Sequence, residues 1–433
     1  MYHWASVTAG KFGRTVGFFA GFWNCLAWIF GAASMSLILG NQTVAMYMLF
    51  HPELEAQSWH IFVSYIICTW LCCSLVLFAN RALPSILNLG LFFIVAGVFI
   101  TIVVCAVMPH VNGVGYASND FVWKDWTNNT GWSSHGFAFV LGMLNGAYSC
   151  GTSDVTSHIA EEIPRYVWNW HQSRPRLTSC SPSKNVPKAI LAQMVTGFLT
   201  AVPYMIALFY AINNLDDILT SNSTFPLAPI YHQATGTRGG ALGLLILAFI
   251  PTFITCTGCY LTCGRTLWTL ARDNATPFSG WTSKVSKTFQ NPFNATLVCG
   301  VFITILGCIY VGSSTAFQAF IGSYIQLSTL SYLAAILPHL LRGRKSFQPG
   351  WFYMHGPWGF IINGFSCLYI VAFIVIFCFP FAMPVDETSM NYASLMTGGL
   401  TMFVGVWFLF RRKSYEGAKA VPIGDALLSK TAI

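Results

Sequence analysis

"GFAFVLGMLNGAYSCGTSDVTSHIAEE", residues 136–162, begins as an apolar helix and changes character near its middle. Small and polar residues follow at 145–146 and 149–153, where the centre of a bilayer would lie. Glycine and clustered hydroxyl residues weaken a helix, because glycine loses backbone entropy and hydroxyls compete for the helical hydrogen bonds. Non-helical backbone is stable at membrane depth only where it lines a cavity or is buried in protein. The stretch therefore predicts a broken membrane helix whose ends meet at a binding cavity.

Asp154 lies just after this interruption and is the only one of the 14 acidic residues inside a predicted span. A carboxylate within the membrane is costly and indicates a functional site. Three roles stay open at this point. The side chain could carry a coupling proton, face a cationic substrate, or cap the second half of the helix by accepting from its amides.

The composition extends this prediction to the whole chain, which is 55% hydrophobic and only 8% charged. Soluble domains carry about 25% charged residues. Apolar runs of roughly 18 or more residues with few charges are typical of transmembrane helices. Ten such runs are predicted, at residues 16–48, 61–80, 86–108, 136–154, 189–212, 241–263, 295–312, 316–341, 359–380 and 392–410. We expect one all-α polytopic membrane domain across residues 1–433, embedded in a lipid bilayer.

The net charge of +8 does not indicate a nucleic-acid partner, because the basic residues are spread over alternate ends of the spans. The connecting loops at the other ends hold most of the acidic residues. By the positive-inside rule the basic ends are cytoplasmic. Both termini, including a short tail at 411–433, are then expected in the cytoplasm. The plasma membrane is the expected location, with a vacuolar or other internal membrane as the alternative.

Other polar residues within the spans are weaker candidates for a binding site. Asn24 stands alone in the first span, and Thr255, Thr257 and Tyr260 form a polar face in the span that follows residue 240. Asn, Ser and Thr side chains also join neighbouring membrane helices by hydrogen bonds. Each of these residues therefore either lines a cavity or holds two helices together.

The sequence gives little support for a metal site, a cofactor or an active site. The Cys-x-x-Cys pattern at 256–259 matches a redox motif, but thiols at membrane depth are ordinary packing residues. No Cys/His group has zinc-binding spacing. His158, Glu161 and Glu162 cluster only at the cytoplasmic end of the broken span, which is too little for an enzyme active site.

Several motifs together resemble the amino acid–polyamine–organocation permeases, and in particular the fungal branch with GABA and choline permeases. The broken span carries an aromatic residue, then Gly151, then an acid, and continues as "HIAEEIP" (158–164) and "NVPKAI" (185–190). The other motifs are "GRTLWTLARDNATPF" (264–278), "NPFNA" (291–295) and the opening "YHWASVTAG" (2–10). The resemblance covers essentially the whole chain.

This resemblance implies the leucine-transporter fold, with two inverted repeats of five helices plus two more, and alternating access around a central site. The ten runs here would match family helices three to twelve, so the first two are expected to be absent. The broken first helix of the family binds the substrate through backbone amides, and half of that site would then be missing. The remaining substrate-binding residues are expected to be Tyr148, Ser149, Cys150, Gly151, Thr152, Asp154, Asn24, Thr255, Thr257 and Tyr260.

The resemblance also implies a function. We expect a proton-coupled secondary active transporter for a small amine or amino acid substrate, such as an amino acid, GABA, choline or a polyamine. The alternative is a truncated paralogue or sensor that retains the permease fold without transporting. An enzymatic activity is not expected.

One segment suits neither a membrane helix nor the family pattern. Residues 165–181 interrupt "EEIP" and "PSKNVPKAI" with a run rich in Arg, Pro, Ser and Trp. One interpretation is a disordered cytoplasmic loop. The other is a retained intron, because codons for Arg165-Tyr166-Val167 and Cys180-Ser181 can contain fungal splice signals with the frame preserved. Codons without those signals would exclude the second interpretation.

Overall fold

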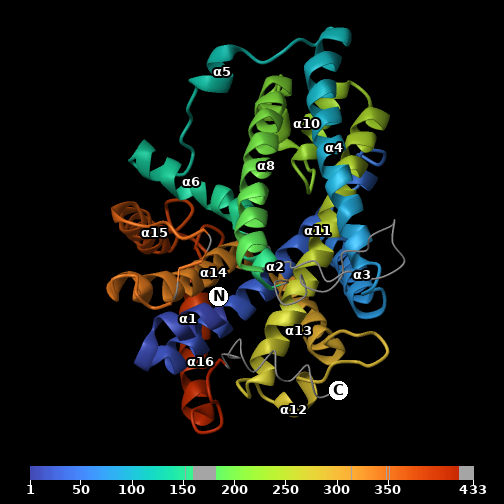
Figure 1. Cartoon of the computed structure of the whole chain (residues 1–433). Coiled ribbons are helices and arrows are strands. Elements are labelled where there is room, and N and C mark those ends of the chain that lie inside the picture. The colour runs from blue at the N-terminus through green and yellow to red at the C-terminus, as the bar shows by residue number, and fades with distance from the viewer. Residues whose placement is uncertain (152, 159–181, 314, 348, 351, 419–433) are drawn as a thin grey trace, which may run out of the picture.

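The computed structural model describes residues 1–151, 153–158, 182–313, 315–347, 349–350 and 352–418 (Figure 1). The predicted insert at 165–181 lies outside these residues, as do Thr152 and residues 419–433 of the predicted tail. All regular structure in the described part is helical. The helices are α1 (Tyr2–Thr8), α2 (Gly13–Met48), α3 (Ser58–Phe78), α4 (Leu83–Val111), α5 (Asn119–Trp123), α6 (His135–Cys150), α7 (Val155–His158), α8 (Pro182–Ala211), α9 (Leu215–Thr220), α10 (Leu227–Thr235), α11 (Arg238–Arg272), α12 (Ser279–Thr282), α13 (Phe293–Gly312), α14 (Ala316–Leu341), α15 (Pro357–Ile376) and α16 (Ala393–Arg411).

Nine of the described helices are long and apolar enough to cross a membrane, whereas ten spans were expected. The tenth, at 136–154, is divided between α6 and the one-turn helix α7. The 16 residues of α6 rise about 24 Å, which is less than the roughly 30 Å of a hydrocarbon core. The break predicted within this span is therefore confirmed, and it accounts for the difference between nine and ten spans.

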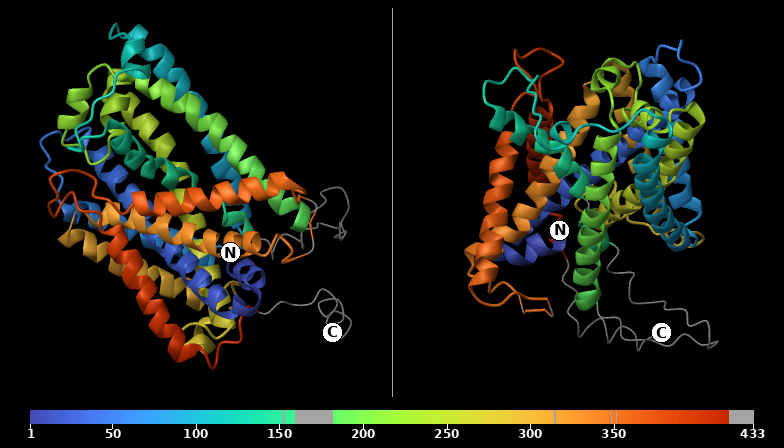
Figure 2. Two further views of the ribbon diagram at one scale, coloured as in Figure 1. Left: turned by 90° about the vertical axis from the view of Figure 1, so that its left-hand side faces the viewer. Right: turned by 90° about the horizontal axis from the view of Figure 1, so that it is seen from above.

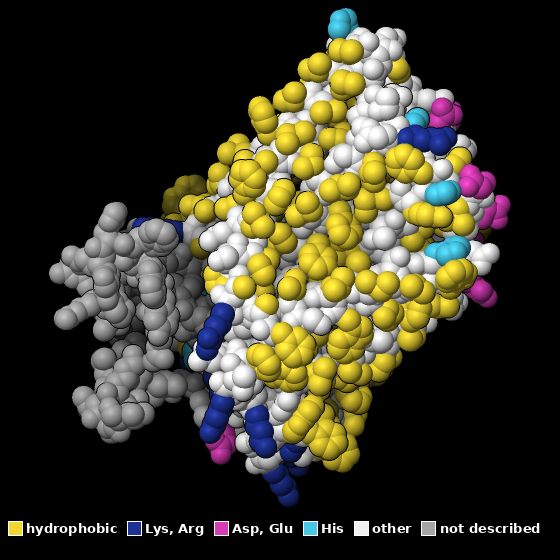
Figure 3. All heavy atoms as spheres, turned by 90° about the vertical axis from the view of Figure 1, so that its right-hand side faces the viewer, with side chains coloured by type: hydrophobic (Ala, Val, Ile, Leu, Met, Phe, Trp, Pro, Cys, Tyr) yellow, Lys and Arg dark blue, Asp and Glu magenta, His cyan; other side chains and the backbone are white. Residues whose placement is uncertain are grey.

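The surface has the pattern of a membrane protein. A broad band of exposed apolar side chains covers the face in Figure 3. Lys and Arg side chains gather mainly toward one edge of this face, and acidic and His side chains mainly along the opposite edge. The long helices run obliquely past one another as one bundle, with α15 and α16 at one side and α4 at the other (Figure 2). The apolar band suits contact with lipid chains, and the two charged edges suit the two aqueous sides.

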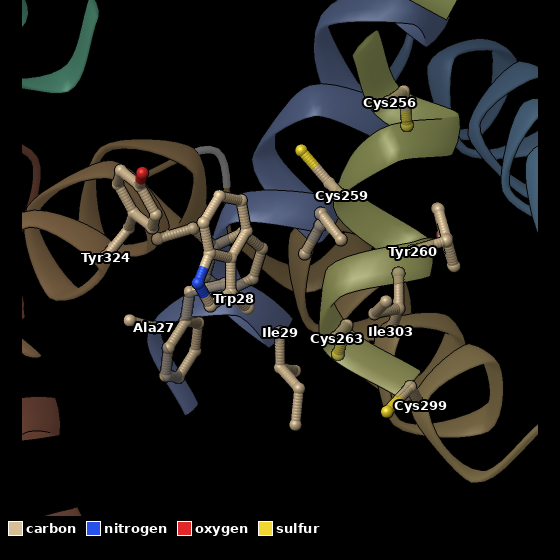
Figure 4. Packing of buried hydrophobic residues seen from close by; sticks show 14 of the residues in the cluster. Ala27, Trp28, Ile29, Cys256, Cys259, Tyr260, Cys263, Cys299, Ile303 and Tyr324 are labelled. Carbon is tan, nitrogen blue, oxygen red and sulfur yellow. The ribbon is translucent and has the colours of Figure 1, made fainter. Parts of the chain in front are cut away.

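Helix α2 forms the centre of this bundle. It packs against α14, α11 and α3, and also against α1, α13 and α16. A helix surrounded by protein on all sides is expected to be apolar all round, and α2 carries buried side chains on every face. Figure 4 shows Trp28 of α2 beside Tyr324 of α14, with Cys256, Cys259 and Tyr260 of α11 across from it. Cys256 and Cys259 are free, buried thiols that pack among apolar side chains.

Close packing of α3 against α13 gives a first testable prediction. A methyl group at Gly307 would lie 2.2 Å from the ring of Tyr65, which is fully buried. Gly307→Ala is therefore expected to destabilise the protein, because overpacking costs about 1–3 kcal/mol against the roughly 1 kcal/mol that alanine gains in a helix. Thermal unfolding in detergent measures the effect. Gly312→Ala on the same helix is the matched control, because no atom lies within 4 Å of its added methyl group. A Gly307→Ala protein as stable as that control would contradict the prediction.

Candidate functional site

The chain leaves the helical conformation between α6 and α7, close to α14. The amide of Gly151 bonds to the carbonyl of Tyr148, and this caps α6. The Gly151 carbonyl accepts from the hydroxyl of Tyr324 at 2.8 Å and from that of Tyr332 at 3.3 Å. A helix end buried in protein needs such partners for its unpaired carbonyls. Two tyrosines of α14 therefore stabilise the break.

Asp154 lies just beyond the break, 2% exposed. Its Oδ2 accepts from Asn24 Nδ2 at 2.8 Å and from Trp28 Nε1 at 3.4 Å, both on α2. The Tyr332 hydroxyl donates to Oδ1 at 2.8 Å. His158 Nε2 lies 3.0 Å from Oδ2. Side chains of α2, α7 and α14 thus converge on a single buried carboxylate.

The contacts of α7 separate the roles left open for Asp154. The backbone carbonyl of Asp154 accepts two hydrogen bonds from Ser157, one from its amide at 2.9 Å and one from its hydroxyl at 2.7 Å. The carboxylate of Asp154 accepts neither of them. Among the hydrogen bonds of the described residues, none joins an α7 amide to the carboxylate. The expectation that the side chain caps the second half-helix is therefore not met. Among the described residues, the carboxylate contacts only side chains, which is compatible with a packing role and with a charge-carrying role.

The electrostatics of the cluster suit a proton or a cation. An ionised carboxylate removed from water costs several kcal/mol unless opposite charge or hydrogen bonds compensate it. Asn24 Oδ1, next to the carboxylate, is buried and has no hydrogen-bond partner. The NH₂ group of Asn24 must face Asp154, because an ionised carboxylate only accepts hydrogen bonds and the amide oxygen of Asn24 cannot donate one. A carboxylate beside an unpaired amide oxygen is a pair of acceptors that an N–H donor or a protonated group could satisfy.

Aromatic side chains enclose one side of this cluster. The Trp28 ring meets the rings of Tyr324 and His158 edge-on, with centroids 6.0 and 6.2 Å apart. Tyr148 meets Tyr324 edge-on at 5.5 Å, and its hydroxyl shares a 2.6 Å hydrogen bond with Ser34 Oγ. These rings pack edge to face and form an apolar wall on this side of the cluster.

A cavity of about 730 Å³ opens beside Asp154, between α1, α14 and α15. Its polar lining includes Ser153, Asp154, Tyr332, His339, Asn363 and Tyr369. Among the described residues that line it, Asp154 is the only acid, and there is no Lys or Arg. The volume lies within the range of small-molecule sites, about 300–1,000 Å³.

The structure brings together part of the predicted site. Tyr148, Gly151, Asp154 and Asn24 lie in the cluster just described. Ser149 and Cys150 are exposed, and the Ser149 hydroxyl bonds to the helix backbone at Asn145. Thr152 lies outside the described residues.

The polar face of α11 lies apart from the break. Thr257 is buried and donates to the Phe253 carbonyl at 3.0 Å, and the Tyr260 hydroxyl pairs with Ser36 Oγ at 3.2 Å. Thr255 lines a separate cavity of about 240 Å³. Tyr260 thus joins α11 to α2, which was the second possibility given for it, whereas the hydroxyl of Thr257 bonds within α11.

Four side chains of the cluster were absent from the expected site: Trp28, Tyr324, Tyr332 and His158. His158 carried a usable signal, because it follows Asp154 by four residues and therefore shares its helix face. The tyrosines are eight residues apart and share a face of α14. Nothing local distinguishes them among the 17 tyrosines of the chain.

An all-helical membrane fold with a broken helix, a buried carboxylate and an adjoining cavity defines a polytopic transporter. Comparison with known proteins gives the family. Residues 1–401 match the family model described as "Amino acid permease", and the chain belongs to this family, within the amino acid–polyamine–organocation superfamily. It is a permease and not an enzyme.

Curated relatives agree with this assignment. The chain is 31% identical to a "Choline transporter" of Saccharomyces cerevisiae over 410 residues, 93% of this chain and 68% of the relative. It is 28% identical to the "7-keto 8-aminopelargonic acid transporter" of the same yeast, over 90% of this chain and 70% of the relative. It is 23% identical to that yeast's "GABA-specific permease", over 98% and 72%.

Proposed function

We propose that the protein is a secondary active transporter that moves a small amine or amino acid across a membrane by alternating access, coupled to protons. The observation that carries this proposal is Asp154, a carboxylate 2% exposed at a broken helix and beside a cavity. The cost of burying this charge is explained if a cation or a proton binds there in each cycle.

The break supplies an element that can move. Helix α7 is attached to α6 through non-helical backbone. The Asp154 carboxylate in this connection bonds to side chains of α2 and α14, and His158 of α7 contacts Thr266 of α11. Hydrogen bonds of this kind can exchange partners when a ligand enters. A ligand that binds one arrangement more tightly shifts the equilibrium toward it.

The lining of the 730 Å³ cavity favours the amine end of a substrate. Asp154 is the only acid among the described residues that line it, and an ionised carboxylate attracts a positively charged nitrogen whether or not that nitrogen carries N–H. The names of the relatives include choline, GABA and 7-keto 8-aminopelargonic acid, which all contain an amine or ammonium nitrogen. The substrate class proposed here is therefore a small organic amine, with or without a carboxylate.

The charge distribution supports an orientation. The edge rich in Lys and Arg faces the cytoplasm by the positive-inside rule, and the edge rich in acidic and His side chains faces outward (Figure 3). We place the protein in the plasma membrane, so that its substrate is taken up from outside the cell.

Uptake of a small panel tests the proposal. Labelled choline, GABA, putrescine and alanine are supplied to cells that lack their own uptake of these solutes and express the full chain. At least one is expected to accumulate, and a protonophore is expected to reduce that accumulation. If surface labelling shows the protein at the membrane but none of the four accumulates, the non-transporting alternative replaces the proposal.

A further inference from the structure

We propose that Asp154 and His158 form a proton-carrying pair that connects two adjoining cavities beside α7. This inference rests on the proposed transport function and deepens it, because it names the groups and the route for the coupling proton. Asp154 lines the 730 Å³ cavity described above. His158 lines a second cavity of about 370 Å³, bounded by α1, α11 and the segment before α13.

The geometry of the imidazole is the first argument. Its Nε2 lies 3.0 Å from Asp154 Oδ2, and its Nδ1 lies 3.5 Å from the hydroxyl of Thr266 on α11. One ring therefore contacts the buried carboxylate with one nitrogen and a different helix with the other. The side chain of His158 is 13% exposed and that of Asp154 is 2% exposed, so the imidazole is the more accessible member.

The two cavities meet at this pair. Ser157 lines both cavities. Asp154 precedes Ser157 in the sequence, and His158 follows it directly. A proton that reaches His158 from the smaller cavity is one hydrogen bond from the carboxylate that faces the larger one. Histidine suits this step, because its ordinary pKa lies near physiological pH.

The charge around the pair limits how many protons it holds. From α1, the Met1 amino group and His3 line the smaller cavity, and from α11 so does Arg265. From α2 and α14 the facing groups are Asn24, Trp28 and Tyr332. Asp154 is the only acid among the described residues that line either cavity.

One proton therefore changes the net charge of the pair between two values. Neutral imidazole beside the carboxylate gives −1, and imidazolium beside the carboxylate gives zero. In the step we propose, a hydronium ion in the smaller cavity gives a proton to His158, the proton held between Nε2 and Asp154 Oδ2 neutralises the pair, and water in the larger cavity then accepts a proton from the carboxyl group.

His158→Gln tests the proposal, because glutamine can still donate a hydrogen bond to Asp154 but cannot take up a proton near neutral pH. The purified protein is placed in liposomes with a pH gradient, and labelled choline, GABA and putrescine are the probes. Accumulation driven by the gradient is expected to fall at least fivefold, whereas exchange of internal for external probe falls less than threefold. His110→Gln, an exposed position at the end of α4, is the matched control and is expected to retain both.

If His158→Gln accumulates the probe under the gradient as well as the unmodified protein does, the proposal that Asp154 and His158 carry the coupling proton is refuted. If His158→Gln does not fold, Thr266→Val replaces it, because it removes the contact at Nδ1 and, besides that, only the bond of the Thr266 hydroxyl to the Thr262 carbonyl of its own helix. That variant is expected to shift the midpoint of the pH profile by about half a unit or more, and an unchanged midpoint would also overturn the pair. If the unmodified protein carries none of the probes, the transport function itself fails. If it carries one without any response to the gradient, only the proton pair is refuted.

Discussion

Asp154→Asn is expected to reduce uptake by more than about a hundredfold while the protein still reaches the membrane. Asparagine has nearly the same shape as aspartate, but it places an NH₂ group among the donors of Asn24, Tyr332 and Trp28. It also removes the charge that a proton or an ammonium group would neutralise. A buried hydrogen bond to a charged group contributes about 1.5–3 kcal/mol, so the loss of two such bonds suffices for this effect. Initial rates of labelled uptake, divided by the amount of protein at the surface, measure it.

Asp120→Asn is the control for this variant. Asp120 is exposed in the short helix α5 and pairs with Lys124 on the surface, where such pairs contribute about 0–1 kcal/mol. Its uptake is expected to match that of the unmodified protein. Unchanged uptake by Asp154→Asn, with an unchanged dependence on pH, would show that the carboxylate serves only the packing of the break.

The fold class was predictable because the bilayer imposes it on the sequence. Helices that face lipid must satisfy their backbone internally and carry apolar side chains, and this produces long apolar runs. The interruption after α6 was predictable because adjacent glycine and hydroxyl residues weaken a helix locally. Asp154 followed from the cost of an unpaired charge in the membrane. In each case a single stretch of chain contained the whole physical argument.

The hydrogen-bond partners of Asp154 depend on how helices distant in the sequence pack together. No single stretch of the sequence holds that information. Asn24 was expected to bond to a neighbouring helix more often than to a ligand. It does bond to the segment after α6 at 2.8 Å, yet its oxygen is left unpaired beside the carboxylate. Thr257 and Tyr260 had the same polar character as a cavity lining, but they bond within α11 and to α2. The choice between cavity lining and interhelical contact is made by tertiary packing.

Tyr332→Phe is expected to lower uptake about tenfold or more, and Tyr324→Phe is expected to have a smaller effect. The two tyrosines lie on the same face of α14 and both donate to the carbonyl of Gly151. Only Tyr332 also donates to Asp154 Oδ1, at 2.8 Å, and no other donor to that oxygen is present among the described residues. Phenylalanine at 332 therefore leaves a buried carboxylate oxygen without a hydrogen bond. Phenylalanine at 324 removes the shorter hydrogen bond to the Gly151 carbonyl and leaves it only the 3.3 Å contact with the Tyr332 hydroxyl, whose single proton is shared with Asp154 at 2.8 Å.

Comparing Tyr332→Phe with Tyr324→Phe distinguishes a role in stabilising the helix break from a role in holding the Asp154 carboxylate. If they serve only the helix break, the two variants should transport equally, because each removes one donor from the same carbonyl. If Tyr332 also holds the carboxylate, thermal unfolding of Tyr332→Phe, Asp154→Asn and the double variant should reveal a coupling of about 1.5–3 kcal/mol. The corresponding set of Tyr324→Phe, Asp154→Asn and their double variant should show little coupling, since the Tyr324 hydroxyl donates to the Gly151 carbonyl and not to Asp154. Equal uptake by the two variants together with no coupling would contradict the assignment of Tyr332 to the charge site.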